Sequence, residues 1–263
     1  MKIQMKGMTA IVCGSTSGIG KATATVLASA GANVILFARS EQKLQETVKQ
    51  LPKVETEQTH RCLVADFDRP EAVSKAITTE LDRNEPVHIL VNNTGGPAPG
   101  RAIDSTAVDY IKAFNRHLVV NQVLAQLLVP RMIKAGYGRI INIVSYSAKT
   151  PIPGLGVSNS VRGAVASWAK TLAGELAPHG ITVNNVLPGL TETERLSGLI
   201  QNRAKEAGTT PEEIAEQMKA TIPARRFARP EETAEAVAFL ASPSAGYING
   251  VNLPVDGGLT PCL

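Results

Sequence analysis

Residues 13–22 read CGSTSGIGKA and separate a short apolar run, TAIVC at residues 9–13, from a helical pattern over residues 18–30. Glycine at positions 14, 18 and 20 lets the backbone turn tightly and lets a pyrophosphate approach it, because no Cβ stands in the way. The helix that starts there offers free N–H groups and the positive end of its dipole. The stretch therefore predicts dinucleotide binding; the alternative is a turn with a purely structural role.

Short apolar runs alternate with helical patterns along most of the chain. The runs are unbroken rather than alternating, which is typical of strands buried on both faces. Strands that are separated by helices form right-handed βαβ units and a parallel sheet. We expect one Rossmann-type α/β domain over residues 1–263, a doubly wound parallel sheet of seven strands with helices on both faces. The expected strands lie at residues 9–13, 33–38, 61–67, 88–93, 138–145, 181–189 and within 249–258.

Composition and charge exclude several classes of protein. The 263 residues are 43% hydrophobic and 19% charged, with a net charge of +4, which is ordinary for a globular protein. Nucleic-acid binding calls for clustered basic and aromatic residues, and the short cluster Arg225, Arg226 and Arg229 is interpreted as solvated surface or an anion contact. No run approaches the ~18 apolar residues of a membrane span. Three scattered cysteines predict no metal site and a reducing compartment, so we expect a cytoplasmic protein.

The end of the second strand distinguishes between the two nicotinamide dinucleotides. An acidic residue there would bind the ribose hydroxyls of NAD and repel a 2′-phosphate. This chain has Ala38 and Arg39 instead. A guanidinium can hold a phosphate with two hydrogen bonds, so the sequence favours NADP over NAD. The alternative is an arginine that faces solvent and carries no specificity.

Further motifs follow in order. The glycine spacing is G-x-x-x-G-x-G, and after it come NNTG at 92–95, INIVS at 141–145, ITVNNVLPG at 181–189 and VDGG at 255–258. From about Lys6 to Leu259 the chain resembles the short-chain dehydrogenase/reductase family, and most closely its bacterial 3-oxoacyl-[acyl-carrier-protein] reductases. The resemblance implies an oxidoreductase that interconverts a carbonyl and a secondary alcohol, on a small molecule or an acyl-carrier substrate.

The resemblance also implies a homotetramer or homodimer, formed through two long middle helices and the C-terminal strand region. The apolar faces of residues 119–129 and 165–173 are compatible with this assembly. The same stripes could equally pack within one monomer.

The cofactor contacts that the resemblance implies come from several loops. In the glycine-rich turn they are Gly14, Ser15, Thr16, Ser17, Gly18, Ile19 and Gly20, followed by Arg39. Asp66 and Phe67 would lie by the adenine, and Asn92 and Arg162 near the ribose. Pro188, Gly189, and Thr191 or Thr193 would lie near the nicotinamide carboxamide. NNTG differs from the family's usual NNAG at Thr94.

The catalytic positions differ from the family more strongly. A family member uses a serine, a helical asparagine, a tyrosine and a lysine four residues after the tyrosine. The resemblance places these four at Ser145, His117, Ser158 and Arg162, and the stretch WAKTLAGELAPHGITVN aligns without a gap and fixes the register. Only the serine is retained.

The replacements change what the site can do with a proton. An aliphatic hydroxyl is a much weaker acid than a phenol of pKa ~10, so Ser158 can donate a hydrogen bond but cannot hold a poised proton. Arg162 keeps the positive charge and can hold ribose hydroxyls, yet it stays protonated. His117, with an ordinary pKa of ~6.5, could supply the proton directly or through water, or it could be bonded inside the fold. Tyr146 with Lys149 is a further candidate acid, although both residues leave a strand.

Residues 190–227 lie where the family keeps its substrate lid and have a polar, helical pattern. Arg195, Arg203, Arg225 and Arg226 could meet an anionic substrate or a carrier-protein surface, or they could form a solvated surface. Two functions remain open: an NADP-dependent oxidoreductase with an atypical active site, and a catalytically silent NADP-binding scaffold or sensor. The retained Ser145 and the full-length lid favour the enzyme.

Overall fold

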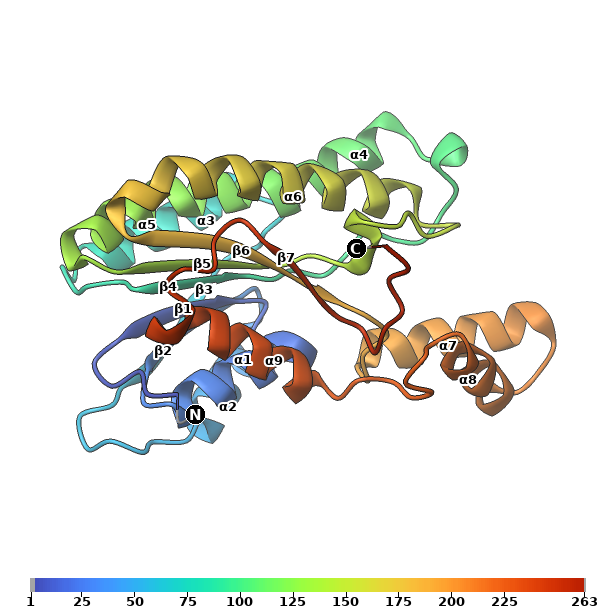
Figure 1. Cartoon of the computed structure of the whole chain (residues 1–263), viewed down its shortest axis with the longest axis horizontal. Helices are drawn as coiled ribbons and strands as arrows, with labels where there is room; N and C mark the ends of the chain where they lie inside the picture. The colour runs from blue at the N-terminus through green and yellow to red at the C-terminus, as the bar shows by residue number, and fades with distance from the viewer. Residues whose placement is uncertain (1–2, 263) are drawn as a thin grey trace.

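Seven strands pair in parallel in the order β3-β2-β1-β4-β5-β6-β7, with helices on both faces of the sheet (Figure 1). The computed structural model describes residues 3–262, so residues 1, 2 and 263 of the predicted domain lie outside the described part. The strands are β1 Thr9–Cys13, β2 Asn33–Ala38, β3 His60–Val64, β4 Ile89–Asn92, β5 Gly138–Ile143, β6 Ile181–Pro188 and β7 Asn252–Val255. The predicted seven-stranded, doubly wound architecture is confirmed.

Nine α-helices connect or follow the strands in the described residues. They are α1 Gly18–Ser29, α2 Glu41–Gln50, α3 Pro70–Leu81, α4 Ala107–Phe114, α5 Val120–Ala135, α6 Gly156–Leu176, α7 Glu194–Ala207, α8 Pro211–Ala220 and α9 Pro230–Ala241. Helices α1, α2 and α9 cover one face of the sheet, and α3, α5 and α6 cover the other (Figure 1). Within residues 3–262, no helix has both the length and the apolar content to cross a bilayer.

Each face of the sheet has its own hydrophobic core. Leu27 and Val237 pack with Leu36 on one face, and Leu124 and Leu128 belong to the core on the other. The apolar stripes of residues 119–129 and 165–173 contribute largely to the second core. Those stripes therefore pack within the monomer, which was the alternative to their forming a subunit interface.

Two strands end earlier than the sequence pattern predicts. β3 stops at Val64 rather than Phe67, because the chain turns at Asp66, whose side chain accepts a hydrogen bond from the Asp68 N–H at 3.0 Å. β5 stops at Ile143, and Ser145 begins a short 3₁₀ turn instead. Both early ends place polar residues in loops at the carboxyl edge of the sheet.

A row of four asparagines crosses the half of the sheet that β4, β5, β6 and β7 form. Asn92, Asn142, Asn185 and Asn252 are register partners on β4, β5, β6 and β7. Each side-chain amide donates to the carbonyl of the next at 2.8 Å. The row therefore satisfies polar groups in a region that is otherwise apolar.

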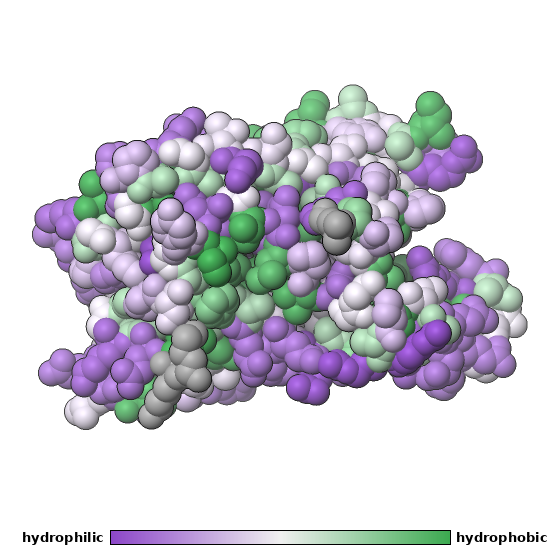
Figure 2. Space-filling view, viewed as in Figure 1, coloured by the Kyte–Doolittle hydropathy of each residue, from purple (hydrophilic) through white to green (hydrophobic). Residues whose placement is uncertain are grey.

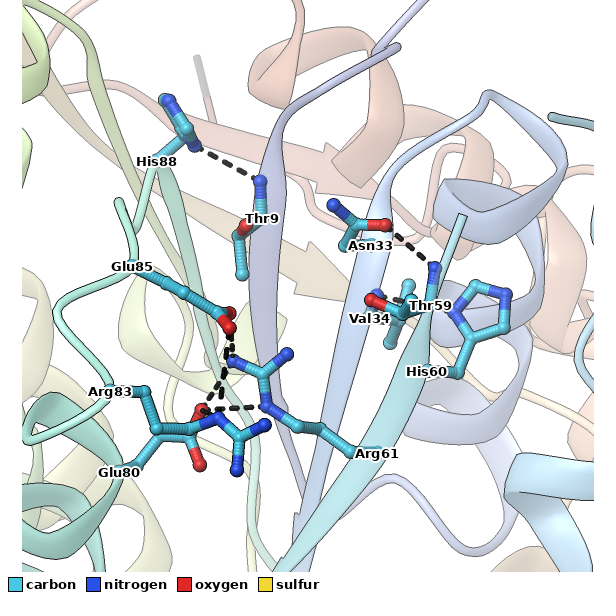
Figure 3. Close-up of polar contacts among 10 residues, drawn as sticks. All are labelled: Thr9, Asn33, Val34, Thr59, His60, Arg61, Glu80, Arg83, Glu85 and His88. Atoms are coloured by element: carbon cyan, nitrogen blue, oxygen red, sulfur yellow. Dashed lines mark hydrogen bonds and ion pairs between the residues drawn. The ribbon is translucent and has the colours of Figure 1, made fainter. Parts of the chain in front are cut away.

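The amino-terminal edge of the sheet, opposite the glycine-rich turn, is held by histidines and an ion-pair network (Figure 3). The ring Nδ1 of His88 accepts a hydrogen bond from the Thr9 N–H at 3.0 Å, and that of His60 accepts one from Val34 at 3.2 Å. Nearby, Arg61 donates to the carboxylates of Glu80 and Glu85. Both rings act as acceptors, which requires them to be neutral.

His60 and His88 together are expected to lower the free energy of unfolding by about 1 kcal/mol as the pH drops from 7.5 to 5.5, in addition to the contribution of the buried His117. Burial lowers the pKa of both His60 and His88. As the pH falls, the two rings are therefore protonated in the unfolded chain before they are protonated in the folded chain. Their contribution is present above the unfolded pKa of ~6.5 and is lost as the pH falls through the lower folded pKa. Urea denaturation at the two pH values measures this. A variant with His60→Asn and His88→Asn keeps acceptors without titrating; an undiminished pH dependence in it would contradict the assignment.

Residues 190–227 extend beyond the carboxyl edge of the sheet as α7 and α8 (Figure 1). Leu196, Ile214 and Met218 belong to a small core of their own in this segment. The two ends of the segment are joined at its base, where Ala228 donates to Leu190 and accepts from Glu192, both at 2.9 Å. Figure 2 shows the surface hollowed between this segment and the end of the molecule that carries α4.

Candidate active site

The glycine-rich turn has the geometry that the sequence predicts. Gly14 and Gly18 adopt positive φ values of +58° and +50°. A Cβ on Gly14 would lie 2.6 Å from the Asn93 carbonyl oxygen, and one on Gly20 would lie 2.7 Å from the Asn93 amide and still nearer the Gly14 oxygen. The turn thus brings β1, α1 and the loop after β4 together so closely that only glycine fits.

The start of α1 is open to an anion. Its N-cap residue, Ser17, makes no side-chain capping bond, so the first N–H groups of the helix are free to bind a phosphate. Thr16, Ile19 and Ser17 lie at least partly at the surface, whereas Ser15 is buried and its Oγ accepts from the Phe37 N–H at 3.0 Å. The residues at the start of α1 fit a dinucleotide diphosphate. Ser15 instead fixes the turn to β2 through its bond with Phe37.

The predicted adenine-side residues lie at the ends of β2 and β3. Arg39 is exposed at the end of β2, and its charge helps to lower the pKa of Asp68. Asp66 is partly buried in the turn described above. Phe67 is buried, with its ring 5.0 Å from that of Phe37, so its side chain packs in the core rather than facing the surface.

The predicted nicotinamide-side residues follow β6. Gly189 leaves no space for a Cβ, which would lie 2.8 Å from Asp256. Thr191 donates to the Gly189 carbonyl at 3.3 Å, and Thr193 caps α7 by accepting from Leu196 at 3.4 Å. A Cβ on Gly18 would lie 3.0 Å from the Thr193 methyl group. The segment from Pro188 onward therefore reaches across to the glycine-rich turn.

His117 lies in a π-helical turn, Asn115–Val119, that joins α4 to α5. Such turns are rare and occur often at functional sites. The neighbouring Arg116 donates to both carboxylate oxygens of Asp68 and to the Gly95 carbonyl. These bonds fix the π-helical turn to the loops after β3 and β4. No sequence pattern predicted the Arg116–Asp68 pair, because its members are far apart along the chain.

The environment of His117 corrects the expectation of an imidazole that titrates near neutrality. The ring is only 3% exposed, and its Nδ1 lies 2.8 Å from the Thr94 hydroxyl. Burial, and then the charges of Arg162 and two further arginines, lower its pKa to about 2. His117 is therefore neutral at working pH and holds no proton of its own to deliver. Thr94 is the residue at which this chain has NNTG instead of the family's NNAG, and its hydroxyl hydrogen-bonds with the His117 ring.

Ser158 and Arg162 lie one turn apart on α6 and face inward. Ser158 is 5% exposed and Arg162 is 8% exposed. Arg162 donates from Nη1 to the Ile143 carbonyl at 3.0 Å, which ties α6 to the end of β5 close to Ser145. The Nε of Arg162 has no partner in the described residues. Burial and the charge of Arg195 lower the pKa of Arg162 to about 10, so it stays charged.

A small cavity of about 10 Å³ is shared by two of the three replaced catalytic residues, His117 and Arg162, and does not include Ser158. It is lined by Asn92, Asn93, Thr94, His117, Asn121, Ile143, Arg162 and Val165. Three of these side chains carry a buried nitrogen or oxygen without a partner in the described residues, namely Asn92 Oδ1, His117 Nε2 and Arg162 Nε. The structure thus brings His117 and Arg162 together with Asn92 at the carboxyl ends of β4 and β5.

Tyr146 does not have the properties of a relocated acid. It begins a single 3₁₀ turn, Tyr146–Ala148, after Ser145. Burial raises the pKa of its phenol, although the charge of Arg203 opposes that effect. A poised acid needs a pKa lowered toward neutrality, so Tyr146 fits a wall of the site better.

The four arginines of the 190–227 segment separate into two groups. Arg226 forms a double hydrogen bond with Glu232 of α9, and Arg225 donates to the Ala220 carbonyl at 2.5 Å. These two are committed to internal contacts. Arg195 instead donates to the Pro97 carbonyl in the loop after β4 at 3.3 Å, whereas Arg203 is exposed and its charge partly offsets the burial that raises the pKa of Tyr146.

Comparison with known proteins agrees with this geometry. A family described as Enoyl-(Acyl carrier protein) reductase matches residues 14–260. Dehydrogenase/reductase SDR family member 4 of Mus musculus is 34% identical over 250 residues, which cover 95% of this chain and 86% of that protein. The chain belongs to the short-chain dehydrogenase/reductase family.

Two further relatives are similar to this chain over its whole or nearly whole length. The 3-oxoacyl-[acyl-carrier-protein] reductase FabG of Aquifex aeolicus is 32% identical over 259 residues, covering 98% of this chain and 100% of that protein. L-sorbose reductase from Gluconobacter frateurii, solved with NADPH and L-sorbose, has a TM-score of 0.94 at 30% identity, with 100% of both chains covered. The dehydrogenase/reductase fold is therefore present over its whole length.

Proposed function

We propose that this short-chain dehydrogenase/reductase is an NADP-dependent oxidoreductase that interconverts a carbonyl and a secondary alcohol at an atypical active site. The observation that carries the proposal is a close-packed glycine-rich turn before an uncapped helix start, together with a retained Ser145 and an inward-facing Ser158–Arg162 pair. Bound NADPH supplies the hydride. Ser145 and Ser158 donate hydrogen bonds that orient the substrate oxygen, and Arg162 holds the ribose and provides positive charge.

NADP is proposed rather than NAD because of Arg39. The residue stands exposed at the end of β2, where a guanidinium can take the 2′-phosphate with two hydrogen bonds. Relatives support the choice, since L-sorbose reductase and actinorhodin polyketide ketoreductase were both solved with NADPH. The remaining cofactor contacts are proposed for the glycine-rich turn, Asn92 and the segment from Pro188 to Thr193.

The substrate oxygen must receive its proton from solvent. Ser158 is too weak an acid, Arg162 stays charged, and His117 is neutral. Acid–base assistance is typically worth ~10²–10⁴-fold, so a site without it turns over slowly rather than not at all. Residues 190–227 are proposed as the lid that closes over the substrate, with its base fixed at Ala228.

A catalytically silent NADP-binding scaffold or sensor is the second candidate. The observation that favours it is that three of the four catalytic positions are changed while the nucleotide end is intact. The retained Ser145 and the hollow between α4 and the proposed lid argue for a site that still admits a small molecule (Figure 2).

Transfer of deuterium from NADPH labelled at C4 separates the two candidates. The enzyme is expected to move deuterium from only one of the two C4 faces into a carbonyl substrate, because the fold fixes the orientation of the ring. Mass spectrometry of the alcohols formed from a panel of ketones and aldehydes measures this transfer. Ser145→Ala is the control, and its rate of transfer is expected to be lower. NADPH binding with no transfer to any panel member would support the scaffold instead.

We also propose that the protein assembles as a homotetramer or homodimer. Val108 and Ile111 on α4 are 70% and 61% exposed, and Ile103 just before them is 81% exposed. Contiguous exposed apolar side chains often mark an interface. Light scattering coupled to size-exclusion chromatography measures the mass, and a monomer at micromolar concentration would contradict the proposal.

A further inference from the structure

A second guanidinium lies beside the reaction site, brought there by the first turn of α7. Arg195 donates from Nη2 to the Pro97 carbonyl at 3.3 Å. A Cβ on Gly96 would lie 2.7 Å from Arg195 Nη2 and still nearer Nη1. The guanidinium therefore lies directly against the loop after β4, two residues beyond the Thr94 that contacts His117.

Positive charge at the site is not balanced by acidic residues. Arg116 is neutralised by Asp68. Within residues 3–262, neither Arg162 nor Arg195 takes part in an ion pair. Arg162 is more than nine-tenths buried and has a free Nε. A buried cation without a partner is unfavourable, so the arrangement calls for an anion from outside the chain.

The lid side of the site carries the same sign of charge. Arg203, two turns after Arg195 on α7, acts on Tyr146, which follows Ser145. Asp256, whose charge also acts on Tyr146, accepts hydrogen bonds from the N–H groups of Gly258 and Thr260. Arg195 and Arg203 thus add positive charge to the site from α7.

We propose that Arg195, with the charge of Arg162 behind it, binds the carboxylate of the substrate, so that the enzyme acts on small oxo acids and the matching hydroxy acids. This inference rests on the proposed function. The carbonyl carbon takes a hydride from NADPH and its oxygen takes a proton from water, which gives the hydroxy acid and NADP⁺. A guanidinium fork matches a carboxylate with two parallel hydrogen bonds. Because Arg195 lies against the loop after β4 and its charge acts on Arg162 and His117, we place the carboxylate of a small substrate there, whereas the charges of a carrier protein would meet the outer surface.

The diphosphate of the cofactor is the other source of negative charge. Thr193 lies over Gly18 at the glycine-rich turn, whereas Arg195 lies against Gly96 in the loop after β4. The position of Arg195 thus favours the substrate, and an experiment can separate the two sources.

The test compares 2-oxobutyrate and 3-oxobutyrate with their uncharged methyl esters, in the wild type and in Arg195→Gln. Loss of a charged hydrogen bond is expected to lower kcat/KM for the acids by about 10- to 100-fold. The esters should change less than about 3-fold, and Arg195→Lys should restore part of the loss for the acids. Lys205→Gln removes one charge from the other end of α7 and should leave the ratio of acid to ester unchanged. NADPH affinity is measured in parallel by fluorescence.

Two results would overturn the proposal. One is a ratio of acid to ester that Arg195→Gln does not alter; a weakened NADPH affinity in the same variant would then assign the guanidinium to the diphosphate. The other is the absence of 2-oxobutyrate binding to the NADP-loaded wild type by calorimetry. Binding that is lost in Arg195→Gln, without turnover of acid or ester, would support the anion site while refuting the proposed oxidoreductase function.

Discussion

Gly20→Ala is expected to weaken NADPH binding at least ~100-fold. The added Cβ would overlap the carbonyl oxygen of Gly14 and the side chain of Asn93. Neither neighbour can move freely, because Gly14 holds the turn and the Asn93 amide donates to the carbonyls of Cys13 and Gly14 at 3.2 Å. Relief of the overlap must therefore open the turn that receives the diphosphate. Overpacking that shifts side chains and backbone costs about 1–3 kcal/mol, and the upper end of this range corresponds to a ~100-fold loss of affinity. Fluorescence titration with NADPH measures the effect.

Gly163→Ala is the matched control for this substitution. Gly163 lies within α6, and a Cβ there would meet nothing within 4 Å. Alanine should leave NADPH affinity unchanged and raise the free energy of unfolding by about 0.5–1 kcal/mol, because it restricts the unfolded chain and favours the helix. Wild-type affinity in Gly20→Ala, with a normal circular dichroism spectrum, would show that the turn is not the diphosphate site.

Ser158→Tyr combined with Arg162→Lys is expected to raise the rate of reduction of a simple ketone by ~10²–10⁴-fold. The pair would return a phenol to the site together with a cation one turn away on the same helix face, which lowers the pKa of the phenol toward the working pH. The fold supports the exchange, since both positions face inward from α6 next to the end of β5. Initial rates with a panel of uncharged ketones measure the gain.

Ser158→Phe with Arg162→Lys tests whether the gain comes from the hydroxyl. It has the same ring and the same cation, but no proton to give. If the phenylalanine variant were as fast as the tyrosine variant, the effect would come from packing in the pocket. If neither variant exceeded the wild type on any ketone, the surrounding site would have diverged from the family's chemistry beyond these two residues.

Much of the fold was predictable because it depends on local patterns. Unbroken apolar runs between helical segments define the strands, and the glycines at 14, 18 and 20 stand where atoms of other segments or of the turn itself leave little or no room for a Cβ. The ends of strands were less predictable, since the early stop of β3 depends on the turn at Asp66. Such a turn replaces the hydrogen bonds between strands with one bond to a side chain. The hydrophobic periodicity of the sequence does not indicate where this happens.

The candidate site was predictable in position but not in electrostatics. Alignment to a family fixes where Ser145, Ser158 and Arg162 lie along the chain. It does not give the depth of burial that keeps His117 neutral, nor the approach of Arg195 to Gly96. Burial and contacts between distant segments arise from packing, and they decide which side chains can carry a charge or a proton.

The asparagine row that spans β4 to β7 gives one edge of the active site a permanent polarity. All three amide bonds run in the same direction, so their dipoles add, and hydrogen-bonded chains strengthen each member by roughly 10–30%. The negative end of the chain is Asn92 Oδ1, which lines the same small cavity as Arg162. A fixed electronegative pole therefore lies at the cavity that Arg162 also lines, and it favours a cation at position 162, whether that cation is an arginine or a lysine.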